Sequence, residues 1–208
     1  PDILSFCEAM ESPDKDKWVE AAEKEIAEIK SFDTWEEVPF EAVTTRLVPG
    51  VWVFRRKRDP LGNIIKCKAR FCVAGNHLPD EGQETCAPVA AWSTVRLFLA
   101  LSLKLGWHTI SLDASNAFLH PPIEKGHEVF VQMPKGFQSG EGNGFGLRLK
   151  KSLYRLDSAP KLWTQFLFDH LKSEGFQQSK HNPCLFFKKG IMLATYVDDI
   201  ALAVEHKQ

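Results

Sequence analysis

The sequence predicts a mixed α+β protein. Helical patterns, in which apolar residues recur every three or four positions, lie near residues 18–30, 93–105 and 160–175. Segments that alternate between apolar and polar residues, or that gather β-branched and aromatic ones, lie between and after these helices. Their spacing is too irregular for a doubly wound parallel sheet. With 208 residues, 44% hydrophobic and 25% charged, the chain can bury a core in one large domain or two small ones.

The first predicted element is an amphipathic helix. Asp14 or Asp16 can cap it, and it runs to about Lys30 with its apolar residues near one face. We therefore expect a surface helix packed on the main body. Because Pro39 and Pro49 follow, a loop is expected there.

A basic β-hairpin is predicted at residues 51–75. This stretch holds seven Lys or Arg and one Asp, a balance of +6, whereas residues 1–50 hold thirteen Asp or Glu and five Lys or Arg, a balance of −8. On the returning strand Lys66, Lys68 and Arg70 alternate, which places them on one face. Phosphates are an obvious partner for such a face, and a merely solvated hairpin is the alternative.

The middle of the chain predicts a helix followed by a strand. Ser93 or Thr94 begins a helix that runs through Leu105, and Gly106 closes it. This helix is apolar almost all round, so it is expected to be buried. His108–Asp113 then alternates as a strand that ends on an acid.

The next hundred residues predict a short strand, a loop and a helix. The strand is Glu128–Met133, and the glycine-rich stretch 139–146 is expected to be a loop. Pro160 suits the first turn of a helix that ends at Gly175. Further strands are predicted after it.

Two adjacent acids, Asp198 and Asp199, lie between two strand-like segments, 193–197 and 200–204. They are therefore predicted in a tight hairpin turn. Neighbouring carboxylates beside an apolar sheet repel each other and lose hydration, and a divalent cation such as Mg²⁺ compensates for both costs. The alternative is that both are ordinary turn residues that point to water.

A third acid, Asp113, ends a strand in a similar setting. Three acids on two strands can hold two Mg²⁺ ions, which together stabilise the attacking and the leaving oxygen of a phosphoryl displacement. That residues 113 and 198 meet in space is a hypothesis. A two-metal nuclease is an alternative, which predicts cleavage without nucleotides and a further acid or histidine near the site.

The cysteines and the hydropathy exclude other classes. The five cysteines are odd in number and form no C-x-x-C or zinc-like spacing, so reduced thiols in an intracellular protein are expected. The longest apolar run, Val95–Leu103, is interrupted by Arg96 and is far short of a membrane span. A chain that opens on Pro1 is expected to be cut from something longer.

Several motifs together resemble one family. Leu112–Leu119, followed some eighty residues later by Tyr196–Asp199, is similar to the reverse transcriptase of copia-type LTR retrotransposons. Further matches fall in the family's order and cover nearly the whole chain: Trp18, Ala21-Ala22, Glu25-Ile26, Thr34-Trp35, Lys68-Ala69-Arg70, Glu84–Val89, Met133–Phe137 and Lys151–Tyr154.

The resemblance implies a right-hand polymerase, an RNA-directed DNA polymerase that transfers nucleotides. Residues 1–106 would hold the N-terminal helix and the fingers with the basic hairpin, and residues 107–208 the palm. The palm is expected to be an antiparallel sheet with helices on one face, cut after the hairpin of Tyr196–Asp199. The thumb would be absent, so a weak hold on the template and primer is expected.

The resemblance also implies the roles of site residues. Asp113, Asp198 and Asp199 would be the catalytic ligands of Mg²⁺, with Mn²⁺ as a substitute, and the carbonyl of Ala114 would assist. Phe118 would lie under the incoming sugar and exclude a 2′-hydroxyl, its alternative role being core packing.

Three further roles complete the implied site. Lys68 and Arg70 would contact the nucleotide triphosphate, with the division between them left open, and Tyr196 would lie near the primer end. The implied partners are an RNA or DNA template with its primer, deoxynucleoside triphosphates, and the rest of a Pol polyprotein with protease, integrase and RNase H. No membrane partner is expected; the place would be a cytoplasmic virus-like particle or the nucleus.

One segment departs from the family. Tyr154 is usually followed there by Gly-Leu-Lys-Gln-Ala-Pro, but here by Arg155, Leu156, Asp157 and Ser158. Glycine allows close backbone approach to template or nucleotide, and Asp157 reverses a positive charge. A degenerate, non-catalytic relic that keeps the fold and some nucleic-acid binding is therefore the alternative.

Overall fold

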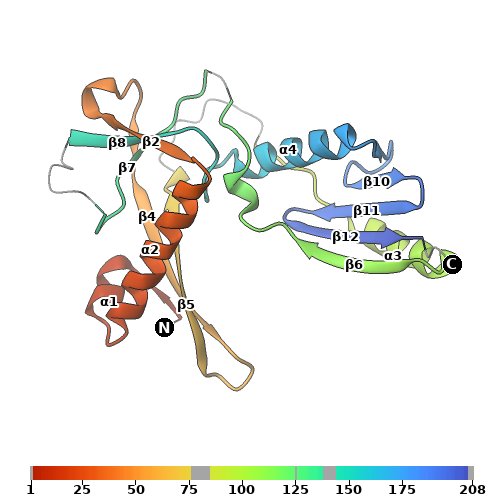
Figure 1. Cartoon of the computed structure of the whole chain (residues 1–208), viewed down its shortest axis with the longest axis horizontal. Helices are drawn as coiled ribbons and strands as arrows, with labels where there is room; N and C mark the ends of the chain where they lie inside the picture. The colour runs from red at the N-terminus through yellow and green to blue at the C-terminus, as the bar shows by residue number, and fades with distance from the viewer. Residues whose placement is uncertain (1, 76–84, 125, 138–143, 206–208) are drawn as a thin grey trace. The chain divides into compact units, whose positions relative to one another are not determined.

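The computed structural model describes residues 2–75, 85–124, 126–137 and 144–205 (Figure 1). They form two compact units, each made of two chain segments. Unit 1 comprises Pro1–Gln83 and Pro122–Ala159, and unit 2 comprises Glu84–Pro121 and Pro160–Gln208. The chain thus passes from one unit to the other more than once, so a single boundary at residue 106 does not separate them.

The described residues of unit 1 form two sheets and two helices. The first sheet has the order β1-β4-β5, and the second has the order β2-β8-β7-β3. The helices are α1 (Phe6–Glu11) and α2 (Lys15–Ser31), and a 3₁₀ turn covers Phe40–Ala42. The strands are β1 (Ile3–Leu4), β2 (Trp35–Pro39), β3 (Leu47–Val48), β4 (Gly50–Arg58), β5 (Ile64–Val73), β7 (Phe130–Gln132) and β8 (Phe145–Leu149).

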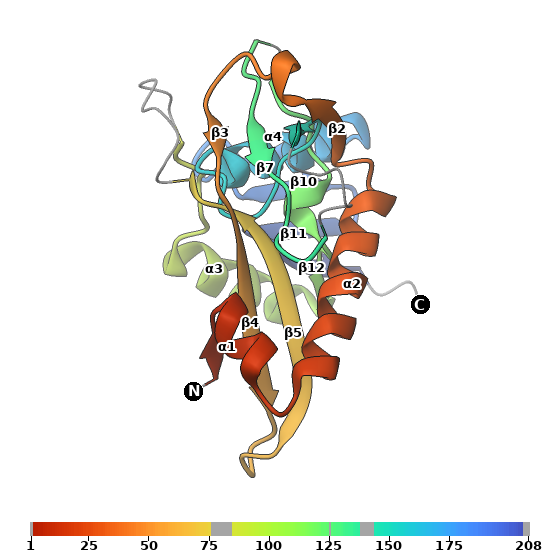
Figure 2. The same cartoon turned by 90° about the vertical axis from the view of Figure 1, so that its left-hand side faces the viewer.

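The core of unit 1 is aromatic. Trp18 of α2 meets Phe54 of β4 edge-on at 5.5 Å between ring centroids, and Trp52 lies 5.4 Å from Phe71 of β5. Trp52 pairs with Phe71 across the hairpin, so these rings share one face. Helix α2 runs beside β5 and covers that face (Figure 2). The predicted helix and the predicted hairpin are therefore confirmed.

Unit 2 is built on one antiparallel sheet with the order β6-β12-β11-β10-β9. Its helices are α3 (Trp92–Leu105) and α4 (Ala159–Ser173), and a 3₁₀ turn covers Ala117–Leu119. The strands are β6 (His108–Asp113), β9 (Gln177–Gln178), β10 (Leu185–Lys188), β11 (Ile191–Tyr196) and β12 (Asp199–Val204). These helices and the principal strands match the prediction.

The helices of unit 2 lie on opposite faces of the sheet. Trp163 and Phe168 of α4 pack with Leu193, whereas Phe98 of α3 packs with Met192. Since neighbouring residues of a strand point to opposite faces, α3 and α4 cover different sides. The prediction of helices on one face only was wrong for this unit.

Helix α3 is also less buried than its composition predicts. It buries Thr94, Phe98 and Ser102, while Leu103 remains 87% exposed. Only one stripe of a helix can meet a flat sheet, so apolar residues on the other side stay outside. Gly106 closes the helix at a φ of 66°, as predicted.

Two predicted loops contain strands. Residues 35–49 hold β2 and β3, and the stretch 139–146 runs into β8, its residues 139–143 lying outside the described part. Gly146 lies within β8, and a Cβ there would come 2.9 Å from the end of the Leu47 side chain. A larger residue at this position would therefore require Leu47 to shift.

Candidate catalytic and phosphate-binding sites

Strand pairing in unit 2 brings the three aspartates to one end of the sheet. Strands β6 and β12 pair so that Asp113 lies directly opposite Asp199. Directly paired residues of antiparallel strands point to the same face, with Cβ atoms roughly 4.5–5.5 Å apart. The amide of Ala114 donates to the carbonyl of Asp198 over 2.9 Å, which ties the end of β6 to the β11–β12 turn.

The donor chemistry of this end suits a hard cation. Asp113 and Asp199 are exposed and Asp198 is half-buried, so all three carboxylates have access to solvent ions. Carboxylate oxygens are the ligands that Mg²⁺ prefers. Among the described residues, however, no three His, Cys, Asp or Glu side chains already form a metal-binding group. The backbone therefore places the acids together, while the side chains are not drawn into a ligand cluster.

The turn that carries Asp198 is strained. Tyr196 pairs with Asp199, so Val197 and Asp198 form a two-residue turn, and Val197 has a φ of 56°. A β-branched residue in the left-handed region is a rare conformation and costs about 1–3 kcal/mol. Such a conformation persists only where surrounding contacts hold it.

Trp163 provides one such contact. Its indole Nε1 donates to the carbonyl of Val197 over 2.8 Å, and the ring is 95% buried, with a relative exposure of 5%. A buried indole fixed by packing presents its N–H in one direction. Trp163 and Ala114 thus hold the two successive carbonyls of the turn.

The other residues predicted near the aspartates have different environments. Phe118 and Ala114 are half-buried and pack against the α4 side of the core, so core packing of Phe118 is observed. Tyr196 is 53% exposed at the end of β11. It is therefore available for contact with a ligand.

Lys68 and Arg70 belong to unit 1, where they lie on the outer face of the hairpin. The Arg70 guanidinium carbon sits 4.7 Å from the centroid of the Tyr154 ring, within cation–π range. Burial lowers the pKa of Lys68, and the nearby cations Arg70 and Lys57 lower it further. The lysine therefore lies in a field of like charges.

Sequence reasoning missed two cations on the same face. The register pairs Arg55 with Lys68 and Lys57 with Lys66, so both strands contribute. We call this set the basic face: Arg55, Lys57, Lys66, Lys68 and Arg70. The alternate positions of Arg55 and Lys57 along the first strand were the available signal in the sequence. Which face they share with Lys66, Lys68 and Arg70 depends on how the two strands pair.

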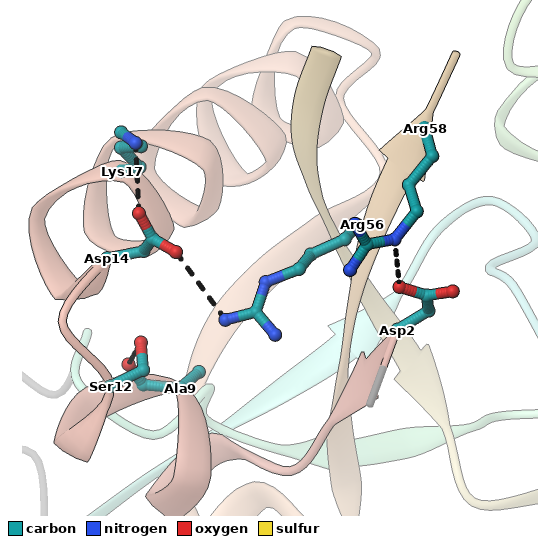
Figure 3. A network of polar contacts seen from close by, with 7 residues as sticks. All are labelled: Asp2, Ala9, Ser12, Asp14, Lys17, Arg56 and Arg58. Carbon is teal, nitrogen blue, oxygen red and sulfur yellow. Dashed lines mark hydrogen bonds and ion pairs between the residues drawn. The ribbon is translucent and has the colours of Figure 1, made fainter. Parts of the chain in front are cut away.

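The alternate arginines of the same strand are neutralised. Arg56 reaches Asp14 at 3.5 Å and Arg58 reaches Asp2 at 2.7 Å, as Figure 3 shows. Among the residues described here, no member of the basic face lies within ion-pair distance of an acid. The hairpin therefore concentrates its unneutralised charge on one side.

One acid approaches the basic face from the edge of β5. Glu25 of α2 accepts a hydrogen bond from the Phe71 amide at 3.4 Å, which satisfies an edge donor of the sheet. Burial raises the pKa of Glu25 to about 7, and the fields of Arg70 and Lys68 oppose that rise. Near neutral pH, Glu25 thus offsets the cations only in part.

The segment that departs from the family's pattern is also strained. Arg155 has a φ of 62°, between the buried residues Tyr154 and Leu156. Gly75 lies so close that a Cβ there would come 2.4 Å from the Arg155 carbonyl oxygen. This conformation favours glycine, so the departure has a backbone cost beyond the change of side chain.

The chain is similar to known proteins along its length. The family profile described as reverse transcriptase (RNA-dependent DNA polymerase) matches residues 32–208. A retrovirus-related Pol polyprotein from transposon TNT 1-94 of Nicotiana tabacum is 28% identical over 210 residues, covering 98% of this chain and 16% of the relative.

Two further relatives come from a plant and from yeast. The Pol polyprotein from transposon RE2 of Arabidopsis thaliana is 30% identical over 93% of this chain and 14% of the relative. The transposon Ty1-BL Gag-Pol polyprotein of Saccharomyces cerevisiae is 27% identical over 91% of this chain and 11% of the relative. The chain thus spans less than a fifth of the length of these relatives.

Proposed function

Because the chain belongs to the reverse transcriptase family, in the branch of copia-type transposons, we propose that it performs RNA-directed DNA synthesis as part of a longer Pol polyprotein. Membership confirms the resemblance found in the sequence. The observation that carries the proposed chemistry is the register that sets Asp113 opposite Asp199, with Asp198 in the adjoining turn.

In this proposal the three aspartates hold two Mg²⁺ ions, which Mn²⁺ can replace. The bound metals would neutralise charge on the attacking 3′-oxygen and on the leaving pyrophosphate. Asp113 and Asp199 contribute from one face of paired strands, and Asp198 from the turn. The carbonyl of Ala114, the residue that follows the last residue of β6, is the additional oxygen proposed to assist.

The remaining site residues are proposed to orient substrate. Lys68 and Arg70 would contact the triphosphate, because both are cations on the outer hairpin face. Phe118 would exclude a 2′-hydroxyl from the sugar site, and Tyr196 would contact the primer end. The exposed ring of Tyr196 supports the proposed contact with the primer end. The packing of Phe118 against the core supports its proposed role by holding the Phe118 side chain in a fixed position.

The polyprotein context supplies the other partners. We propose that a template with its primer and deoxynucleoside triphosphates are the substrates, and that protease, integrase and RNase H belong to the same polyprotein. The proposed location is a cytoplasmic virus-like particle or the nucleus. Within the described ranges, no helix is both long and apolar enough to cross a bilayer.

A second candidate is a relic that keeps the fold without catalysis. The strained Arg155 favours it, because the left-handed backbone is held there without the glycine that the family uses. The two candidates differ in one measurable property, which is metal-dependent primer extension.

The test is extension of a DNA primer on an RNA template by the 208-residue chain with Mg²⁺ or Mn²⁺. Asp198→Asn should abolish extension and weaken Mn²⁺ binding measured by electron paramagnetic resonance. Asp169→Asn, which changes an exposed acid of α4, is the matched control and should retain both properties. Equal extension by the wild type and Asp198→Asn would exclude Asp198 from the mechanism. Mn²⁺ binding without any extension would favour the relic.

A further inference from the structure

Three aromatic rings of unit 2, those of His120, Phe166 and Trp163, form what we call the aromatic cluster. His120 stacks on Phe166 with 6.1 Å between ring centroids and an interplanar angle of 28°. Phe166 stacks on Trp163 at 6.2 Å and 29°, and the His120 and Trp163 centroids are 6.1 Å apart. These separations lie within the range of aromatic pairs, so each ring contacts the other two.

The aromatic cluster has a polar contact to each of the two segments that carry the aspartates. Trp163 donates to the carbonyl of Val197 over 2.8 Å, in the β11–β12 turn. Nε2 of His120 lies 3.4 Å from the carbonyl oxygen of Ser115, which comes two residues after Asp113 at the end of β6. One cluster of rings therefore contacts the backbone on both sides of the proposed metal site.

The contact of His120 with Ser115 requires a protonated ring nitrogen. A carbonyl oxygen accepts and does not donate, so Nε2 carries the proton, as it does in one neutral tautomer and in the cation. The 3₁₀ turn Ala117–Leu119 delivers this donor, because it ends at His120, whose amide donates to the Ala117 carbonyl over 3.3 Å. The side chain thus returns to a carbonyl five residues earlier in the chain.

Packing alone does not explain a histidine in the aromatic cluster. Phe166 is 40% exposed and His120 is half-buried, so the outer part of the cluster adds little to the core. A phenylalanine would stack on Phe166 as well as a histidine does, and it would avoid the cost of a partly buried polar ring. What the histidine adds is the donor to Ser115.

We propose that His120 is a positioning residue: its Nε2–H holds the chain at Ser115, and the stacked rings join that hold to the bond that Trp163 makes in the β11–β12 turn. Asp113 is thereby kept in place relative to Asp199. Residues that orient metal ligands from outside the coordination shell affect metal affinity although they touch no metal. This inference rests on the proposed function for the metal site, and adds a residue that supports the site from behind.

Three replacements separate the donor of His120 from its ring. His120→Phe keeps a stacked ring and removes the donor, His120→Gln keeps an N–H of similar reach and removes the ring, and His120→Ala removes both. A positioning role makes the glutamine variant resemble the wild type more than the phenylalanine variant does. A role in packing alone predicts the reverse order. His170→Phe, at an exposed histidine of α4, is the matched control.

The first measurement is hydrogen exchange of the Ala114 amide, followed by NMR in the 208-residue chain without metal. This amide donates to the Asp198 carbonyl over 2.9 Å, so its protection reports how firmly the two segments are held together. One hydrogen bond corresponds to a roughly two- to tenfold change in an equilibrium. Protection should fall by such a factor in His120→Phe and His120→Ala, and it should be restored in His120→Gln and unchanged in His170→Phe.

The second measurement is the affinity for Mn²⁺, by electron paramagnetic resonance, with thermal unfolding of the same samples. Affinity should fall by a similar factor in His120→Phe and recover in His120→Gln. The unfolding midpoint should follow the other order, because phenylalanine preserves the stacked rings and glutamine does not. A loss of affinity in His120→Phe is therefore distinguished from a loss of folding. In primer extension the loss should appear in kcat, with the KM for nucleotide retained.

Unchanged protection of Ala114 in His120→Phe, or equal losses in His120→Phe and His120→Gln, would overturn the proposal. So would a loss of protection that leaves the affinity for Mn²⁺ at the wild-type value, because His120 would then not act on the metal site.

The proposed function can fail independently. If the wild type neither binds Mn²⁺ nor extends a primer, and exchange of Ala114 still follows the predicted order, the hold of His120 on the chain stands and the proposed metal site does not. If the wild type extends primers and the three His120 variants match it in every measurement, only the role of His120 is wrong.

Discussion

Replacing Arg155 by glycine should stabilise the protein. Arg155 has a φ of 62°, a region that costs an L-residue roughly 1–2 kcal/mol. Its neighbours are fixed, because Tyr154 and Leu156 are buried and the Val73 amide donates to the Tyr154 carbonyl at 2.9 Å. The backbone therefore cannot relax locally.

The net gain is smaller than the relief of strain. Glycine has more freedom in the unfolded chain, which offsets about 0.4–1 kcal/mol. Arg155 is exposed, so removing its side chain loses little packing. The expected net stabilisation is about 0.5–1 kcal/mol, or an increase of about 1–4 °C in the unfolding midpoint of a chain this long.

The assay is chemical and thermal unfolding of three proteins followed by circular dichroism. Arg155→Ala removes the same long side chain but keeps the Cβ, so it should show no gain. Arg155→Gly should be more stable than Arg155→Ala by roughly the energy of the backbone strain that it relieves, minus the cost of the greater freedom of glycine in the unfolded chain. If the glycine variant is no more stable than the alanine variant, the strain argument is wrong.

Two further predictions concern buried contacts. Trp163→Phe keeps an aromatic ring but removes the donor to the Val197 carbonyl, so it should lower the free energy of unfolding by about 1 kcal/mol. It should also reduce the rate of primer extension more than it reduces nucleotide affinity. The control Trp107→Phe, in the same unit, should retain the wild-type rate of extension. Glu25 has its pKa raised to about 7 from 4.5, so the folded state binds the proton more tightly. The stability that this provides is complete below pH 4.5 and is lost as the pH rises through 7; the difference in unfolding free energy between wild type and Glu25→Gln should therefore shift across this window by up to about 3 kcal/mol. A difference that stays constant from pH 4 to 8 would show that Glu25 does not titrate with folding.

Local signals in the sequence predicted those elements whose contacts are local. The periodicity of α2 and α4 and the turn between β4 and β5 each lie within a short window, and all three were found. In the sheet of β2, β3, β7 and β8 only β7 was predicted as a strand, and the sheet itself was missed because its pairing joins distant segments. Trp35, for example, pairs with Leu149. Each strand alone is short, β2 ends on Pro39, and β8 contains Gly146.

Strand register also explains which features of the sites could be predicted from the sequence and which could not. The sequence identified Asp113 and Asp199 separately, as an acid that ends a strand and an acid in a turn. That they face each other depends on which strands pair, and β6 pairs with β12 across some ninety residues of chain. Likewise Arg55 and Lys57 joined the predicted lysines only through the register of the hairpin.

Val197 and Arg155 are two of the non-glycine residues with a positive φ, and they show why a departure from a pattern is hard to interpret from sequence alone. Val197 and Arg155 have similar φ values, 56° and 62°. At Val197 the next peptide is held, because Trp163 donates to its carbonyl and Ala114 to that of Asp198. The strain there fixes the position of an acid that the proposed chemistry needs. At Arg155 the buried neighbours impose the conformation, and glycine would satisfy it at less cost. Similar φ values therefore have different consequences at the two positions, and the supporting contacts distinguish them. Loosening the turn at Val197 should impair catalysis, whereas relieving the strain at Arg155 should only stabilise the fold.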